Sequence, residues 1–222
     1  MTTAQEQEDF FRPWPLGPHY GELADGAGPR AWVNYKLHSA DWYIETLEAA
    51  IAKVGFDRHV GIEMALDGAL TSLCAGYDAS SAALIGVAER YLQVEEPTPL
   101  WEYKPSLLIQ LLGRLSQQGL TGDLIGTRSR IKAALVRKET SKGWLTMLQD
   151  LRNRPMHNDT LPRHFDAVVG SPTASALNVG GTPTEPVSYL REAYRDVSNL
   201  SGELLDIVDK LAPNGMITQR EP

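Results

Sequence analysis

The chain has 222 residues, of which 42% are hydrophobic and 22% are charged, and its formal net charge at pH 7 is -7. This composition is typical of a globular protein that buries a substantial core, and it excludes a disordered chain. The acidic balance argues against bulk binding of nucleic acid, and no apolar run approaches the roughly 18 residues that span a bilayer. The polar N-terminus lacks the pattern of a secretory signal, and the single cysteine excludes a disulfide framework. We therefore expect a cytoplasmic protein that contacts no membrane.

The first half of the sequence predicts an arm and two long helices. Residues 1–30 are rich in proline and glycine, which predicts an irregular N-terminal arm. Two helices are expected next, over 32–54 and 58–92, because apolar residues recur along both segments with a period near 3.6. Cys74 falls in the second helix, where we interpret it as a small core residue rather than a nucleophile. Prolines then predict a loop over 95–105.

The second half of the sequence predicts shorter helices followed by one long helix. Leucines at helical spacing predict a helix over 106–119, and a basic helical stretch is expected from Arg128 to Lys138. Ser141 is expected to start a further helix that runs to Leu151. A final amphipathic helix is expected over 187–211.

The remaining segment, 163–186, is the least helical part, and we expect a loop or a small hairpin there. In the hairpin interpretation its strands are 167–170 and 176–179. Amphipathic helices must bury their apolar faces against one another, which predicts an all-α fold, an antiparallel helical bundle of about four to six helices. The bundle is expected to span 31–212, with 213–222 as a C-terminal tail.

Positive charge is concentrated in one part of the chain. Between Lys104 and Arg163 there are 11 Lys and Arg residues against 4 Asp and Glu residues, whereas the rest of the chain is strongly acidic. Such a stretch can be a solvated helix face, or it can guide a polyanion. In the second interpretation, the residues that bind the phosphates of a nucleic acid are Arg128, Arg130, Lys142, Arg154 and Arg163.

The same basic stretch contains the segment with the best claim to chemistry, 151–157. Pro155 opposes the continuation of a helix, so we expect the chain to turn within 153–156. Arg152 and His157 stand five residues apart, which places them on different sides of a regular helix. A distorted helix end, or a second copy of the chain, is needed to bring the two side chains together.

These side chains suit the cleavage of a phosphodiester. A guanidinium such as that of Arg152 can hold phosphate oxygens and stabilise developing negative charge. An imidazole such as that of His157 can remove or donate a proton near neutral pH. Asn153 can hydrogen-bond the phosphate or hold the imidazole in one orientation. RNA supplies its own nucleophile, the 2′-hydroxyl, so we expect no metal and no cofactor.

The run Arg152-Asn153-Arg154-Pro155-Met156-His157 resembles the motif of the HEPN superfamily. In that family four to six residues separate an Arg from a His, a polar residue follows the Arg, and the motif lies at a helix end in an all-α bundle. The resemblance implies a metal-independent endoribonuclease that acts as a homodimer, joins two motifs in one cleft and leaves 2′,3′-cyclic phosphate ends. Many members are toxins of toxin–antitoxin pairs or act in defence against phage, which implies an RNA substrate and an antitoxin partner.

Carried over to this sequence, the resemblance implies that Arg152 stabilises the phosphate, that His157 is the acid and base, and that Asn153 is their polar companion. Pro155 is an unusual occupant of the motif. Asp159 stands where toxins silenced by a nucleotidyltransferase have a tyrosine, which argues against adenylylation of this position. The alternative is a non-catalytic HEPN-like bundle that binds a protein partner or a nucleotide.

Two further groups of residues have a structural and a functional interpretation. Asp67 and Asp78 share one face of the second long helix, and we favour buried polar anchors over a role in a cleft. The first long helix carries an aromatic cluster, for which we favour core or dimer packing over a platform that stacks bases. The cluster consists of Trp32, Tyr35, Trp42 and Tyr43.

Overall fold

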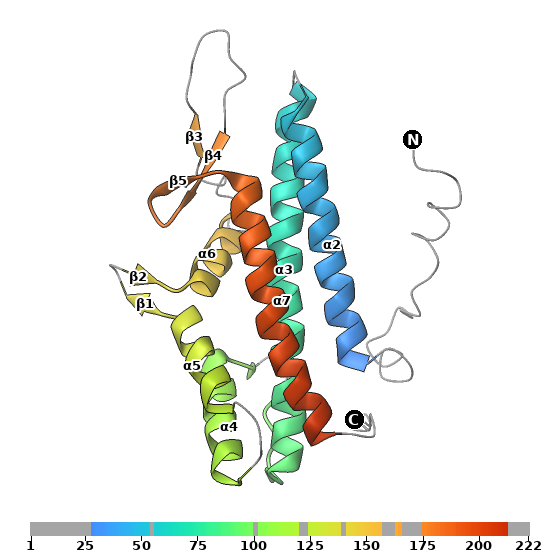
Figure 1. The fold of residues 1–222 in the computed structure, drawn as a ribbon, viewed down its shortest axis with the longest axis vertical. Coiled ribbons are helices and arrows are strands. Elements are labelled where there is room, and N and C mark those ends of the chain that lie inside the picture. Colours follow the sequence, from blue (N-terminus) through green and yellow to red (C-terminus); the bar gives the residue numbers. More distant parts are fainter. Residues whose placement is uncertain are drawn as a thin grey trace, which may run out of the picture.

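Three long helices form the centre of the molecule: α2 (Gly28–Ile51), α3 (Phe56–Tyr91) and α7 (Pro186–Leu211) (Figure 1). Helix α2 is antiparallel to α3, because Gly61 near the start of α3 lies against Ala50, and Gly76 further along lies against Leu37. Helix α7 packs against both and runs in the same direction as α3 (Figure 1). The computed structural model describes residues 28–53, 56–99, 102–119, 124–138, 141–156, 163–165 and 175–212.

Shorter elements cover one side of this centre. Helices α4 (Pro105–Gln117), α5 (Leu124–Ala134) and α6 (Trp144–Met156) lie on the side of α3 away from α2 (Figure 1). Strands β1 (Arg137–Lys138) and β2 (Ser141–Lys142) form a two-stranded antiparallel sheet between α5 and α6. The other strands form a three-stranded antiparallel sheet in the order β3-β4-β5: β3 (Arg163–Phe165), β4 (Ser175–Val179) and β5 (Thr182–Thr184).

Apolar side chains at helical spacing explain why the long helices pack together. On α7 they recur every three or four positions, which places them on one face of the helix. They are fully or almost fully buried: Leu190, Ala193, Val197, Leu200 and Leu204. The start of α7 is fixed by Glu185, whose carboxylate accepts hydrogen bonds from the backbone N–H groups of Val187 and Ser188 at 3.0 and 2.6 Å.

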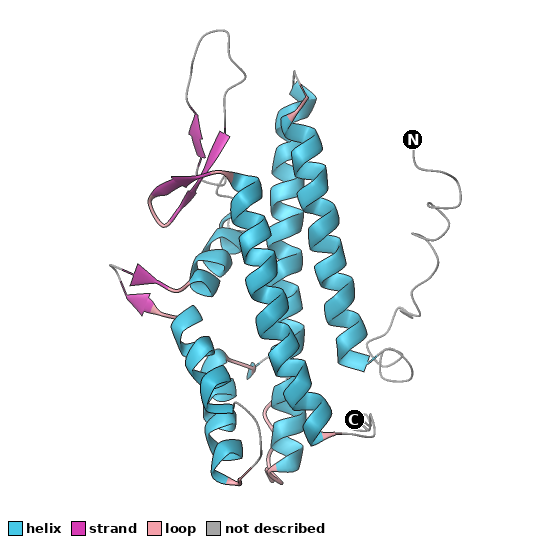
Figure 2. Cartoon of the chain, in the orientation of Figure 1, coloured by secondary structure: helices cyan, strands magenta, loops and turns pink. Residues whose placement is uncertain are grey.

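The predicted all-α bundle is confirmed, since the described chain is mostly helical and its strands are confined to two small sheets (Figure 2). The final helix, predicted over 187–211, begins one residue earlier at Pro186 and ends at Leu211. The two long helices predicted over 32–54 and 58–92 are α2 and α3, with boundaries that differ by up to four residues. In the described part of the chain, no helix is both long and apolar enough to cross a membrane.

The helix predictions were wrong between α5 and α6. Arg137 and Lys138 were predicted to be helical, but they form β1 and pair with Ser141 and Lys142, which were expected to start the next helix. The reason is the close approach of the chain at Gly143, whose N–H donates to the carbonyl of Val136 at 2.9 Å. A Cβ atom at this position would collide with backbone carbonyl groups at the end of α5, so only glycine closes this connection.

The hairpin interpretation of 163–186 is correct for 176–179, which lies within β4. Its hairpin partner is β5, across a tight turn at Gly180 and Gly181, whose φ angles are 60° and 94°. Two consecutive positive φ angles match the two-residue turn that suits the twist of an antiparallel hairpin. The other expected strand, 167–170, lies outside the described residues, as do 1–27 and 213–222.

Candidate functional site

Arg152, the predicted phosphate-stabilising residue, lies on α6 against α3. Leu145, Leu148 and Leu151 bury the apolar face of α6, and Arg152 follows directly as a half-buried residue. Its Nε atom is buried without a hydrogen-bond partner. Burial raises the pKa of two α3 residues, Cys74 and Asp78, and the positive charge of Arg152 acts against this rise in both, which places the guanidinium in their vicinity.

The face of α3 that meets α6 carries four polar side chains at helical spacing: Cys74, Tyr77, Asp78 and Ser81. Cys74 is a free, buried cysteine, and desolvation raises its pKa to about 12, an effect that the charge of Arg152 partly offsets. The thiol is therefore protonated at neutral pH. This confirms the interpretation of Cys74 as a core residue rather than a nucleophile.

Asp78 is exposed to solvent but lies in a recess of the surface. Protein atoms around it withhold part of its hydration, which raises its pKa, while the charge of Arg152 acts in the opposite direction. Because desolvation wins, Arg152 does not neutralise this carboxylate as a close ion pair would. Asp67 is also exposed, so the expectation that both aspartates are buried anchors was wrong.

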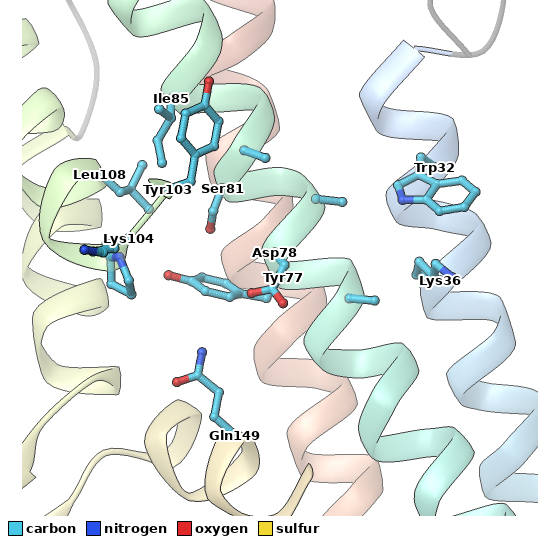
Figure 3. Close-up of a pocket in the computed structure, with 14 residues that line it drawn as sticks. Trp32, Lys36, Tyr77, Asp78, Ser81, Ile85, Tyr103, Lys104, Leu108 and Gln149 are labelled. Atoms are coloured by element: carbon cyan, nitrogen blue, oxygen red, sulfur yellow. The ribbon is translucent and has the colours of Figure 1, made fainter. Parts of the chain in front are cut away.

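The recess is a pocket of about 670 Å³ on the face of α3 that α7 leaves uncovered (Figure 3). Helix α2 forms one wall, and α4 and α6 form the opposite wall (Figure 3). The floor is formed by the methyl groups of Ala75, Ala79 and Ala82, one helical turn apart on α3. These small side chains leave room above the helix, so the pocket follows directly from the composition of this face.

Polar groups converge on the wall of the pocket next to α6. Tyr77 is only 2% exposed, and its hydroxyl makes no hydrogen bond of good geometry, although a side-chain interaction with the Ser81 hydroxyl lowers its pKa in part. Burial outweighs that effect and raises the pKa of Tyr77. The Ser81 hydroxyl is also buried without a partner. Figure 3 shows the Tyr77 side chain and the Gln149 amide reaching into the pocket from α3 and α6.

Two lysines stand at opposite sides of the pocket. Lys36 of α2 lies over the rings of Trp32 and Tyr35, with Nζ at 4.6 and 5.3 Å from the ring centroids, and partial burial lowers its pKa. Lys104 immediately precedes α4, whose N-terminus has Pro105 in its first turn and no side-chain cap. The two ammonium groups and the uncapped helix N-terminus make the rim of the pocket favourable for negative charge.

The structure places only some of the predicted site residues. Arg152 is half-buried beside the pocket, and Asn153 is exposed on the last turn of α6. The expectation of a turn within 153–156 was wrong, because α6 continues through Pro155 and ends at Met156, so all four of these residues are helical. His157 lies outside the described residues, and the side chains of Arg154 and Arg163 do too. The convergence of Arg152 with His157 therefore stays a prediction.

The predicted phosphate-binding residues have different surroundings. Arg130 forms an ion pair with Glu203 of α7 at 2.9 Å, and Lys142 forms one with Asp150 at 2.7 Å. The guanidinium of Arg128 instead lies over Gly113 of α4, and its Nε atom is buried without a hydrogen-bond partner. Of these three side chains, Arg128 is the one that could take a phosphate without breaking an ion pair.

Sequence reasoning missed most of the pocket. Tyr77, Ser81 and Gln149 were not singled out, although hydroxyl groups at positions i and i+4 in a largely apolar helix were a usable signal. The aromatic cluster was interpreted as core or dimer packing. Core packing does not hold for Trp32, which lines the pocket, or for Trp42, which is 45% exposed, and dimer packing stays a prediction. The sequence of a single helix does not show whether its aromatic face packs against a neighbouring helix or lines a pocket.

Comparison with known proteins adds no relative: the chain matches no protein-family model, no curated protein and no solved structure. Among the described residues, no group of three or more His, Cys, Asp or Glu side chains is arranged to hold a metal ion.

Proposed function

We propose that the protein is a metal-independent endoribonuclease of HEPN type that acts as a homodimer on RNA. A toxin–antitoxin or phage-defence system is the setting we propose for this activity, with an antitoxin as a further partner. The observation that supports the proposal best is the guanidinium of Arg152. It is half-buried, its Nε atom has no hydrogen-bond partner, and it forms no ion pair with any described residue.

The state of Arg152 favours an anion as its missing partner. A guanidinium offers five N–H donors, and a partly buried charge without a partner is unfavourable unless a ligand supplies one. A phosphate group can accept two parallel hydrogen bonds from it. Burial raises the pKa of Asp78 despite the opposing charge of Arg152, and the two side chains form no close ion pair. The surroundings of Arg152 therefore suit the binding of an anionic ligand better than the stabilisation of the fold.

The reaction uses the nucleophile of RNA itself. His157 accepts the proton of a 2′-hydroxyl, whose oxygen attacks the adjacent phosphorus and displaces the 5′-oxygen of the next nucleotide. That leaving oxygen takes up a proton, and the products are a 2′,3′-cyclic phosphate and a 5′-hydroxyl. Arg152 stabilises the negative charge that develops on the phosphate oxygens, and Asn153 orients the phosphate or the imidazole. In the homodimer, the second copy of the motif completes the cleft.

The basic residues bring the RNA to this centre. Arg128, Arg154 and Arg163 are the side chains that we assign to the RNA backbone, with Arg130 and Lys142 contributing when they exchange their carboxylate partners for phosphates. Charges on this surface act at long range and weaken with salt, so they should raise affinity without selecting a sequence.

The test is cleavage of total RNA by the purified protein in EDTA. We expect Arg152→Ala to lower the cleavage rate about 100- to 1,000-fold, as loss of a transition-state donor does. His157→Ala should have an effect at least as large. Matched controls are Arg195→Ala and His59→Ala, which remove exposed residues in the first half of α7 and near the start of α3. Cleavage by the wild type and both controls, with cyclic phosphate ends, would support the proposal; equal cleavage by all five proteins would contradict it.

One observation favours the second candidate, a non-catalytic bundle that binds a nucleotide. The pocket of about 670 Å³ has the size of a small-molecule site and combines apolar, aromatic and charged side chains. A protein that binds a nucleoside monophosphate but leaves every RNA intact in the same assay would be of this kind. The first candidate is preferred because it also gives a role to the whole segment from Arg152 to His157.

A further inference from the structure

We propose that the pocket between α2, α3, α4 and α6 binds one base of the RNA and selects the nucleotide next to the cleaved bond. We call it the base pocket. The inference rests on the proposed ribonuclease function and adds a source of sequence preference to it. Gln149, which lines the base pocket, precedes Arg152 by three residues on α6, so the two side chains are about one helical turn apart.

The hydroxyl of Tyr77 is the strongest sign of a missing ligand. The side chain is 2% exposed and reaches into the base pocket (Figure 3). Its oxygen makes no hydrogen bond of good geometry, and the neighbouring Ser81 hydroxyl serves as a partner only in part. Buried polar atoms nearly always have a partner, and those that lack one need an explanation. A ligand atom in the pocket would supply the missing hydrogen bond.

The polar groups of this wall match the edge of a base better than they match a phosphate. The hydroxyls of Tyr77 and Ser81 and the amide of Gln149 can each donate and accept hydrogen bonds. A base edge presents donors and acceptors side by side, whereas the oxygens of a phosphodiester only accept. Bases of single-stranded RNA are commonly recognised in this way, through their hydrogen-bonding edges.

The shape of the base pocket suits a planar ring. Its floor is a row of alanine methyl groups, against which a flat ring can lie without displacing a side chain. Aromatic rings border it on two sides, Trp32 from α2 and Tyr103 from the segment before α4 (Figure 3). Contact between bases and aromatic rings is favourable for every base, so the polar wall must supply any preference.

The charges of the base pocket suit a nucleotide within a chain. Lys36 and Lys104 stand on different walls and can each meet a phosphate on one side of the bound base. Asp78 lies beside Tyr77 and accepts hydrogen bonds when ionised, which favours a base with an exocyclic amino group. We therefore expect adenine, guanine or cytosine to be preferred over uracil.

The experiment maps cleavage sites on one defined single-stranded RNA that contains every dinucleotide. Wild type is compared with Tyr77→Phe, which removes only the unpartnered hydroxyl, and with Gln149→Ala. The matched control is Tyr189→Phe, because the Tyr189 hydroxyl is also buried without a partner but does not line the base pocket. Thermal unfolding of each variant checks that the fold is kept. Binding of AMP, GMP, CMP and UMP is measured with the same proteins.

We expect wild type and Tyr189→Phe to share one cleavage preference and one order of nucleotide affinities, with UMP the weakest. Tyr77→Phe should reduce the preference and the affinity for the best nucleotide about tenfold, as the loss of one hydrogen bond does. A wild type that cleaves RNA at the same sites as Tyr77→Phe would overturn the inference. A wild type that cleaves no RNA would contradict the proposed function instead. In that case nucleotide affinities that depend on Tyr77 would still support the base pocket, and their absence would reject it.

Discussion

Buried polar groups have different surroundings in two regions of the molecule. One region is the interface of the three long helices, and the other is the contact between α3 and α6. Within the three-helix centre, the hydroxyl of Ser80 lies 3.1 Å from that of Ser201 and 2.8 Å from the carbonyl of Tyr77, so a fully buried polar group is satisfied. At the surface of this three-helix centre, ion pairs join the helices, such as the pair of Arg191 on α7 with Glu48 on α2 at 2.9 Å. The serine pair follows the rule that interior polar groups are paired. The Tyr189 hydroxyl of α7 is an exception, because it is buried without a hydrogen-bond partner.

The contact between α3 and α6 departs from that rule. Buried polar atoms without a well-formed hydrogen bond occur there on Tyr77 and Ser81 of α3 and on Arg152 of α6. Each such atom costs about 1–3 kcal/mol, so a group of them in one place is expensive unless a ligand completes it. The comparison indicates that the long helices carry the stability of the fold. Under the proposed function, a ligand would complete the unpartnered groups at the contact between α3 and α6.

The largest expected effect concerns the connection that positions α6. Gly143→Ala would place a Cβ atom against the carbonyl groups at the end of α5, and it should lower the free energy of unfolding by about 3 kcal/mol. The control is Gly202→Ala on α7, where a Cβ meets no neighbouring atom. The better helix propensity of alanine should raise the free energy of unfolding of this variant by about 0.5–1 kcal/mol. Urea denaturation measures both. Equal effects would mean that Gly143 does not constrain the α5–α6 connection.

A smaller effect is expected from two neighbouring serines on opposite sides of the comparison. Ser80→Ala leaves the Ser201 hydroxyl without its partner and should cost about 1 kcal/mol of unfolding free energy. Ser81→Ala removes a hydroxyl that has no partner, so its effect should be smaller or stabilising. The urea concentrations at the midpoints of unfolding compare the stabilities of the two variants. A Ser81→Ala protein less stable than Ser80→Ala would disprove the contrast between the regions.

The smallest effect is the dependence of stability on pH at Asp78. Its pKa is raised in the folded state, so in the range just above the ordinary carboxyl value the unfolded chain loses this proton first. The unfolding free energy should therefore fall as the pH rises through this range, because the folded state binds more protons. Asp78→Asn should remove that part of the slope. Urea unfolding between pH 3.5 and 6 measures the slope, and an identical slope in both proteins would contradict the raised pKa.

The helices could be predicted well from the sequence, and the turns between them less well. Helix α7 was predicted to within one residue, since the spacing of its leucines and valines is a local property. The short strands β1 and β2 were missed because basic residues in a run are equally compatible with a helix face. What decides between them is Gly143, whose importance depends on the α5 carbonyls that it faces in space.

The candidate site was predicted in part. Arg152 was singled out from its neighbours in the sequence, and it proved to be half-buried without an ion pair among the described residues. The pocket beside it could not be predicted, because it combines side chains from α2, α3, α4 and α6 that are distant along the chain. Asp78 was noticed, but its helix face alone gave no reason to place it in a recess.

The sequence by itself determined the helical class, the extent of the long helices, the concentration of basic residues and the identity of Arg152 as a residue of interest. These properties depend on periodicity and on neighbours within a few residues, which are fixed before the chain folds. Only the tertiary structure decided that Arg130 and Lys142 pair with carboxylates, that Arg152 does not, and that Tyr77 faces a hollow. Burial and pairing are properties of the packed molecule, because they depend on which distant side chains come within a few ångströms.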